Sequence, residues 1–269
     1  MSVTLNNLVN DPGDNLTGTQ MDKAEVQALL MGVVVARTDT GAVNNWAPGL
    51  DGHTLITWAG ASDATVSGLA GGIAGQRVTV RNTGTKVAYF LYQSGLSSAG
   101  NKFTNAATSG STPIAPGGWI TYQYDGTTWQ LVAHEQGDWI TPTFAAGNYV
   151  GSGAMTWTLA AGDVTSQRWW LRGKRLSLQF MLDTTTVGGT PATDLKILNG
   201  AWGGYLVTTG AGSFPGTVSW AQDNSVLVDA FVQMDPSSNF VRIVKRSFAT
   251  WGAATNTTSV YGGIEVGVA

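Results

Sequence analysis

The chain contains no cysteine and few charged residues. Its 269 residues include 14 Lys or Arg and 17 Asp or Glu, a charged fraction of 12%, where about 25% is usual for soluble proteins. The absence of cysteine excludes disulfide bonds and thiolate metal sites. The formal net charge is −3, and the densest group of cations is RWWLRGKR at 168–175. Because binding to nucleic acid needs a basic face, we expect no nucleic-acid partner.

The residues that usually carry catalysis or hold a metal are also scarce. The two histidines, His53 and His134, have no second His, Cys or carboxylate at a metal-ligand spacing. The chain has no G-x-S-x-G nucleophile motif, and no G-x-G-x-x-G or G-x-x-x-x-G-K motif opens a helix. We therefore expect no metal, no cofactor and no enzyme activity.

One enzymatic alternative stays open, because two carboxylates that face one groove are sufficient for glycoside hydrolysis. The candidates lie in the second half of the chain, mostly beside Gly, Asn, Thr or Pro in predicted turns. Asp is favoured in turns because it bonds its own backbone, so a structural role is the preferred interpretation. The candidates are Asp163, Asp183, Asp194, Asp223, Asp229 and Asp235.

Long hydrophobic runs are absent. The most apolar early run, ALLMGVVVA at 28–36, is far short of the roughly 20 residues that span a bilayer. The first residues also lack the basic start and apolar core of a signal peptide. We expect no membrane insertion and no export through an N-terminal signal.

The chain is rich in short β-type segments. In RVTVR, 77–81, Val alternates with Arg and Thr, and ITYQYDGTTWQLV, 120–132, has the Asp-Gly turn of a β-hairpin. Such segments recur up to the end of the chain, with a pause near Glu135–Gly137. They predict an all-β protein with two jelly-roll-like β-sandwich domains, 37–136 and 137–269. No short-period repeat is visible, so we do not expect a solenoid.

Residues 1–36 are predicted to form an extended arm and one short helix, roughly Gln20 to Met31. Apolar residues at i, i+3, i+4 and i+7 form a stripe on this helix. About three turns of helix are marginal alone, so the stripe needs a partner surface. We expect this segment to mediate oligomerisation and attachment through Val26, Leu29, Leu30 and Val33.

The 11 tryptophans divide into two predicted groups. Those in alternating strands are expected in the cores: Trp58, Trp119, Trp129 and Trp157. Three others lie among Gly, Ala and Asn in predicted loops and are candidates for contact with a partner or a glycan. These are Trp46, Trp202 and Trp251.

Two stretches resemble modules of bacteriophage virion appendage proteins. The first, Gly75–Leu131, resembles a module of tail-fibre and capsid-associated proteins, through NTG at 82–84, SSAGNKF at 97–103, IAPGG at 114–118 and YDGTTW at 124–129. The second, Gly153–Pro191, resembles a β-sandwich module of phage structural proteins. The resemblance implies a structural role in the virion, usually as a homotrimer.

Together these observations predict a non-enzymatic phage virion protein, a tail-fibre or spike component. Its N-terminal segment would attach it to another virion protein, and the C-terminal domain would bind host-surface glycan. The alternatives are a capsid decoration or head-fibre protein, a glycan-degrading tail spike, and a host-cell lectin.

Overall fold

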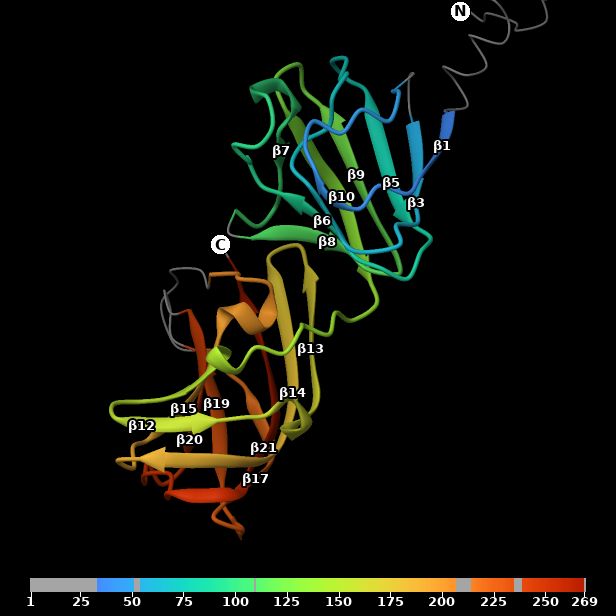
Figure 1. The fold of residues 1–269 in the computed structure, drawn as a ribbon. Helices are drawn as coiled ribbons and strands as arrows, with labels where there is room; N and C mark the ends of the chain where they lie inside the picture. Colours follow the sequence, from blue (N-terminus) through green and yellow to red (C-terminus); the bar gives the residue numbers. More distant parts are fainter. Residues whose placement is uncertain (1–32, 51–53, 109, 207–213, 235–238, 269) are drawn as a thin grey trace, which may run out of the picture. The chain divides into compact units, whose positions relative to one another are not determined.

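The computed structural model describes residues 33–50, 54–108, 110–206, 214–234 and 239–268. In these residues the chain is all-β, as predicted, and its helices are single 3₁₀ turns (Figure 1). These turns are η2 (Ala99–Asn101), η3 (Ala146–Asn148), η4 (Ala161–Asp163) and η5 (Asn199–Trp202). The helix predicted at 20–31, with Val26, Leu29 and Leu30, lies outside the described residues.

The chain divides into two compact units, and each is described by itself. The first contains the described residues up to Asn105 together with Ile114–Gly137. The second contains Ala106–Pro113 and the described residues from Asp138 onward. The main division of the chain falls between Gly137 and Asp138.

The first unit contains a parallel arrangement in which the chain alternates between two sheets. Alternate strands pair in parallel within each sheet. The first sheet contains β1 (Val33–Arg37), β3 (Thr54–Trp58) and β5 (Arg77–Asn82), and the second contains β2 (Gly41–Val43), β4 (Ala64–Val66) and β6 (Ala88–Leu91). Residues 33–36, which the sequence assigned to an N-terminal arm, therefore belong to this sheet.

These six strands form three solenoid-like coils. Equivalent residues in the first sheet, Val33, Thr54 and Val78, are 21 and 24 positions apart. In the second sheet, Val43 pairs with Val66 and Val66 with Phe90, which stacks apolar side chains from coil to coil. The expectation that a solenoid is absent was wrong, because the coils repeat a strand pattern and not a residue motif.

An antiparallel hairpin completes the first unit. As predicted, β9 (Gly117–Tyr124) and β10 (Trp129–Gly137) pair across the Asp125–Gly126 turn. Strand β9 adds antiparallel to β5, and β10 pairs with the short β7 (Phe103–Thr104). In the strand order of the second sheet, β8 (Ser111–Ile114) follows β6, and of its residues Ile114 is grouped with the first unit.

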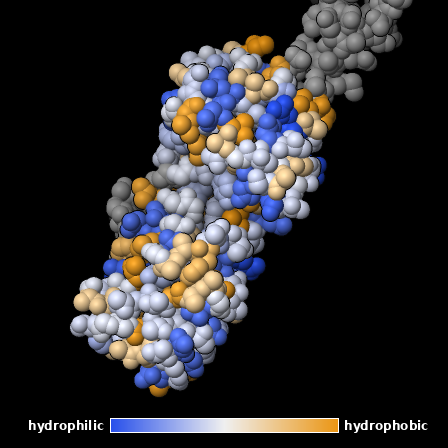
Figure 2. All heavy atoms as spheres, in the orientation of Figure 1, coloured by the Kyte–Doolittle hydropathy of each residue, from blue (hydrophilic) through white to orange (hydrophobic). Residues whose placement is uncertain are grey.

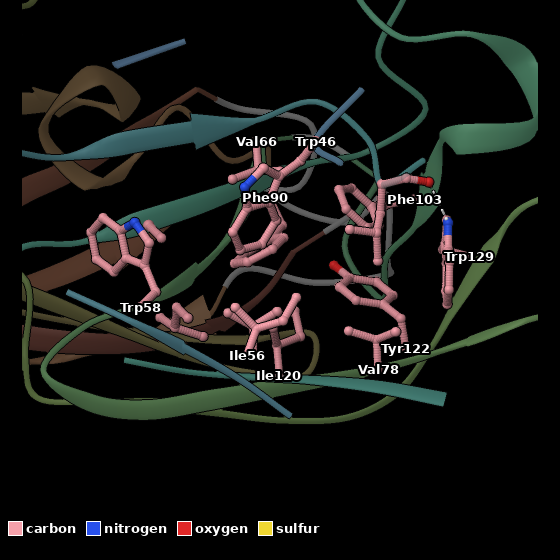
Figure 3. Close-up of a cluster of buried hydrophobic side chains, with 14 of the residues drawn as sticks. Trp46, Ile56, Trp58, Val66, Val78, Phe90, Phe103, Ile120, Tyr122 and Trp129 are labelled. Atoms are coloured by element: carbon pink, nitrogen blue, oxygen red, sulfur yellow. Dashed lines mark hydrogen bonds between the residues drawn. The ribbon is translucent and has the colours of Figure 1, made fainter. Parts of the chain in front are cut away.

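The core of the first unit lies between its two sheets (Figure 3). Val66 and Phe90 face Ile56, Ile120 and other apolar side chains of the opposite sheet. The labelled core residues of Figure 3 are Trp46, Ile56, Trp58, Val66, Val78, Phe90, Phe103, Ile120, Tyr122 and Trp129. Burying this apolar surface is the main favourable contribution to folding.

The second unit consists of two antiparallel sheets. One contains β11 (Tyr149–Gly151), β15 (Asp194–Leu198), β20 (Phe240–Lys245), β19 (Ala230–Met234) and β16 (Phe214–Pro215). The other contains β12 (Met155–Thr158), β14 (Arg175–Gly189), β21 (Ala254–Gly267), β17 (Thr217–Asp223) and β18 (Val226–Leu227), with β13 (Val164–Arg172) paired to β14. Apolar residues from both sheets are buried, including Leu178, Phe180, Leu195, Ile197 and Ile243.

Candidate functional site

The outer face of the sheet β13-β14-β21-β17 carries most of the exposed functional groups of the second unit. Strand alternation puts Trp169 and Leu171 of β13 in the core, so Arg168, Trp170 and Arg172 point outward. The neighbouring β14 alternates in the same way. Its outward residues are Arg175, Ser177, Gln179 and Met181.

Two adjoining shallow hollows lie on this face, with about 600 and 680 Å³ of empty space that is partly open to solvent. Both are lined by Gln179 of β14, Gly263 of β21 and Thr217 of β17, three residues paired across the sheet. Gly263 has no side chain, and its Cα lies between the outward side chains of its two neighbours. The missing side chain therefore leaves this part of the sheet face open, and the charged residues that line the hollows are Glu265 of β21 and Arg168 of β13.

An aromatic pair with an arginine lies on one side of the hollows. The rings of Trp139 and Trp170 are 6.4 Å apart, and the Arg168 guanidinium lies 4.9 Å from the Trp139 ring centre. Arg168 Nε and Nη2 donate to Gln179 Oε1 at 3.0 and 2.8 Å, which fixes the guanidinium over the ring. Arg168 thus connects the two tryptophans to the wall of the hollow.

A second aromatic pair lies on the opposite side. The rings of Tyr261 and Trp220 are 4.7 Å apart, and Tyr261 lines one of the hollows beside the exposed Met181. Burial raises the pKa of the Tyr261 phenol, and the nearby carboxylate of Asp183 raises it further. The phenol is therefore a neutral hydrogen-bonding group at physiological pH.

Each described carboxylate that was considered for catalysis has a structural partner. Asp194, Asp223 and Asp229 pair with basic side chains. Asp183 accepts hydrogen bonds from Ser259 and from the backbone N–H of Thr184, whose φ is 53°. Asp163 caps the Ala160 N–H at the η4 turn. The sixth candidate, Asp235, lies outside the described residues.

The three loop tryptophans do not present their rings to a partner in this structure. Trp46 is 3% exposed, and Trp202 and Trp251 are 0% exposed, which corrects the expectation that they form a contact surface. Trp46 instead donates from Nε1 to Asp39 Oδ2 at 3.0 Å in the core of the first unit. Glycine and alanine neighbours in the sequence therefore did not predict exposure of the ring, and Trp202 lies buried in the 3₁₀ turn η5. Of the tryptophans expected in the core, Trp58, Trp129 and Trp157 are buried, whereas Trp119 is 37% exposed.

Sequence reasoning missed the residues of the outer face, although a signal for them exists. The segment RWWLRGKR was recognised as the densest cationic cluster of the chain. If this segment is a strand, its side chains alternate between two faces. Arg168, Trp170 and Arg172 then lie on one face, and Trp169 and Leu171 lie on the other. Trp139, Trp220 and Tyr261 carry no such local signal.

Among the residues that the structure describes, no group of three or more His, Asp or Glu is placed to hold a metal ion. No helix within the described ranges has the length and hydropathy of a membrane span. The face drawn in Figure 2 shows strongly hydrophilic residues scattered among many of intermediate hydropathy, consistent with the low charged fraction. The chemistry that the outer face offers is ring stacking and hydrogen bonding from Arg, Gln, Ser, Thr and Tyr.

No protein family and no curated protein matches this chain.

Proposed function

We propose that this chain is a non-enzymatic virion structural protein of a bacteriophage, a tail-fibre or spike component that binds host-surface glycan through its second unit. The observation that carries the binding role is the glycine-floored hollow on an open sheet face, with an aromatic pair on each side. Aromatic faces stack on the apolar faces of sugar rings, and amide and hydroxyl groups bond sugar hydroxyls. Because the hollow is shallow and open, it fits part of an extended chain.

The rest of the proposal rests on the sequence. Residues 1–32 attach the protein to another virion protein and join three copies, through the apolar residues Val26, Leu29 and Leu30, because Val33 belongs to β1. The second unit, with its two antiparallel sheets, is a jelly-roll-like β-sandwich. The solenoid-like coils of the first unit join the attachment segment to the binding module along the chain.

A bulky substitution in the hollow tests the binding role. Thr217→Trp places an indole where the sugar is expected to bind, while Trp is well tolerated on an exposed strand position. We expect the variant to lose binding to host cells and to their purified surface polysaccharide. Thr158→Trp is the matched control, because Thr158 is exposed on the same sheet and does not line either hollow. If both variants bind as well as the unsubstituted protein does, the hollow is not the glycan-binding site.

Cryo-electron microscopy of the particle tests the location. Three copies at the tail support the tail-fibre role, and copies at the symmetry axes of the shell support capsid decoration in its place. Release of reducing sugar from host polysaccharide, abolished by Asp183→Asn, would replace the binding role with a degrading one.

A further inference from the structure

The hairpin of β13 and β14 presents an unusual concentration of positive charge for this chain. Arg168, Arg172, Lys174 and Arg175 are all exposed and lie within eight residues, whereas the whole chain has 14 Lys and Arg. The carboxylates nearest to them in the pairing are Glu265, across from Ser177, and Asp138, next to Trp139. Four cations against two carboxylates leave a positive surplus here, although the formal net charge of the chain is −3.

The outward side chains of the hairpin form an ordered grid. Arg168 is opposite Gln179, Trp170 is opposite Ser177, and Arg172 is opposite Arg175. Along β13, Arg168 and Arg172 are four residues apart, about 13 Å in a strand, with Trp170 midway between them. A cation, an aromatic ring and a second cation therefore follow one another in a row beside the hollow.

The arginines of this face differ in how many of their N–H groups already have a partner within the protein. Two N–H groups of Arg168 donate to Gln179, and a guanidinium has five, so further donors of this fixed group face the ligand side. Arg175 pairs with Glu265 at 3.0 Å, with both side chains largely exposed. Arg172 has no ion pair within the described part of the chain. Guanidinium groups match the planar geometry of a carboxylate.

We propose that this hairpin face selects an acidic saccharide, a glycan whose repeating unit carries a carboxylate. Trp170 and Trp139 provide stacking surface for the rings, and Arg168 and Arg172 bind carboxylates along the chain. The hollow, which Glu265 also lines, holds the adjoining uncharged sugar through Gln179 and Thr217. The inference rests on the proposed glycan-binding function and names the class of glycan. A basic aromatic strip also suits single-stranded nucleic acid, but the polar side chains of Gln179 and Thr217 in the hollow beside it favour a ligand with many hydroxyls.

The test uses the full chain and a panel of purified bacterial surface polysaccharides that carry uronic acids. Each polysaccharide is prepared in its native form and after chemical reduction of its carboxylates to alcohols. We expect binding to native forms that weakens as salt is added, and binding to the reduced forms at least about tenfold weaker. Equal binding to native and reduced forms would overturn the inference and leave the proposed glycan role standing. Binding to neither form would contradict both.

Matched arginine variants locate the effect. Arg168→Ala and Arg172→Ala are each expected to weaken binding to the native polysaccharide roughly tenfold, with little change for the reduced one. The control is Arg77→Ala, because Arg77 is exposed and donates from Nε to Gln123 across two strands of the first unit at 3.2 Å, the same kind of pair. A loss equal to that of the control, or equally tight binding to single-stranded DNA, would contradict the assignment. Unchanged thermal unfolding shows that each variant is folded.

Discussion

At the scale of the residue, the position of each tryptophan in its strand decides whether the ring contributes to a core or to a surface. In the first unit, Trp58 and Trp129 are buried, and their indole N–H groups donate to backbone carbonyls of Asp39 and Leu69, both at 2.7 Å. In the second, Trp139 and Trp170 are half-buried and stack with Arg168. A buried indole N–H without a partner costs free energy, so hydrogen bonds as well as packing fix these two tryptophans of the first unit. In the second unit Trp202 and Trp251 are buried by packing, without a hydrogen-bond partner for Nε1 among the described residues.

The carboxylate of Asp125 organises the turn of the β9–β10 hairpin. Its Oδ1 accepts from the Thr127 backbone N–H and hydroxyl, both at 2.7 Å, and from the Thr128 N–H at 2.8 Å. These hydrogen bonds, that of the Thr127 hydroxyl first, lower the pKa of Asp125 below its ordinary value. A carboxyl whose folded pKa is lowered stabilises the protein above its unfolded pKa, about 3.9 for Asp, and the contribution is lost as the pH falls further.

We therefore expect Asp125→Ala to lower the melting temperature at neutral pH. The difference from the unsubstituted protein should shrink as the pH is lowered from about 4, because protonation removes the same contribution. Thermal unfolding followed by circular dichroism over this range is the measurement. Asp125→Asn is the control, since it keeps an acceptor oxygen and removes the charge. A difference independent of pH would mean that the turn geometry alone carries the effect.

A second residue-scale prediction concerns the buried ion pair between Lys245 and Asp223. Their side chains are 9% and 11% exposed, Lys245 Nζ also donates to the Thr250 carbonyl, and the Gly252 N–H donates to Asp223. Lys245→Met leaves the carboxylate buried without its cation, which costs roughly 3–5 kcal/mol. Urea unfolding measures this loss.

The double variant Lys245→Met with Asp223→Leu separates the two explanations of that loss. Removing both charges avoids the unpaired buried carboxylate, so we expect it to recover much of the free energy of unfolding. If the double variant is less stable than Lys245→Met alone, the hydrogen bonds that Asp223 accepts from the Gly252 N–H matter more than charge pairing.

At the scale of the element, a hairpin could be predicted from the sequence whereas a coil could not. Local alternation of apolar and polar residues, together with the Asp-Gly turn, predicts the strands around Asp125–Gly126. Alternation also predicts β14 and β20. The parallel pairing of β1, β3 and β5 joins residues 21 to 24 positions apart that share no motif. Local pattern fixes which face of a strand is buried, but not which strand lies beside it.

The candidate site divides in the same way. The outward row Arg168, Trp170 and Arg172 follows from alternation within one segment, and so could have been predicted. The hollow could not, because it needs Gly263 to lie between Gln179 and Thr217, and these come from three strands that are distant in sequence. The burial of Trp202 and Trp251 likewise depends on packing between distant segments.

Asn82 connects the corner after β5 to the rest of the first unit. Its Nδ2 donates to the carbonyls of Lys86 at 2.6 Å and Ile114 at 2.9 Å, and its Oδ1 accepts from the Gly84 N–H at 2.9 Å. The side chain is 1% exposed. Asn82→Ala leaves these backbone groups without their partner, and we expect a loss of about 2 kcal/mol or more in the free energy of unfolding.

Chemical denaturation of Asn82→Ala, with Thr83→Ala as the control, measures this contribution. Thr83 is exposed at the same corner, and its hydroxyl makes one long hydrogen bond, 3.3 Å to the Trp58 carbonyl. Equal losses for the two variants would show that the corner tolerates the unpaired groups, through water or relaxation.

At the scale of the whole molecule, the main prediction is the number of chains. The apolar residues Val26, Leu29 and Leu30 and the resemblance to phage appendage modules lead us to expect a trimer, with a mass of about three times the 28.1 kDa of one chain. Analytical ultracentrifugation measures it. Leu29→Asp together with Leu30→Asp should yield monomers, because charge on the stripe opposes its burial. If this variant still forms trimers, the contact between the chains lies in another part of the protein.

The three coils of the first unit also bear on how such a protein can change length over evolution. Each coil supplies one strand to each sheet, and equivalent residues recur after 21 to 24 positions. Duplicating or deleting one such stretch adds or removes a layer of about 4.8 Å and leaves the stacking of the other layers intact. A lineage could therefore lengthen or shorten this unit by whole coils, without redesigning either the hairpin that closes it or the sheets that follow.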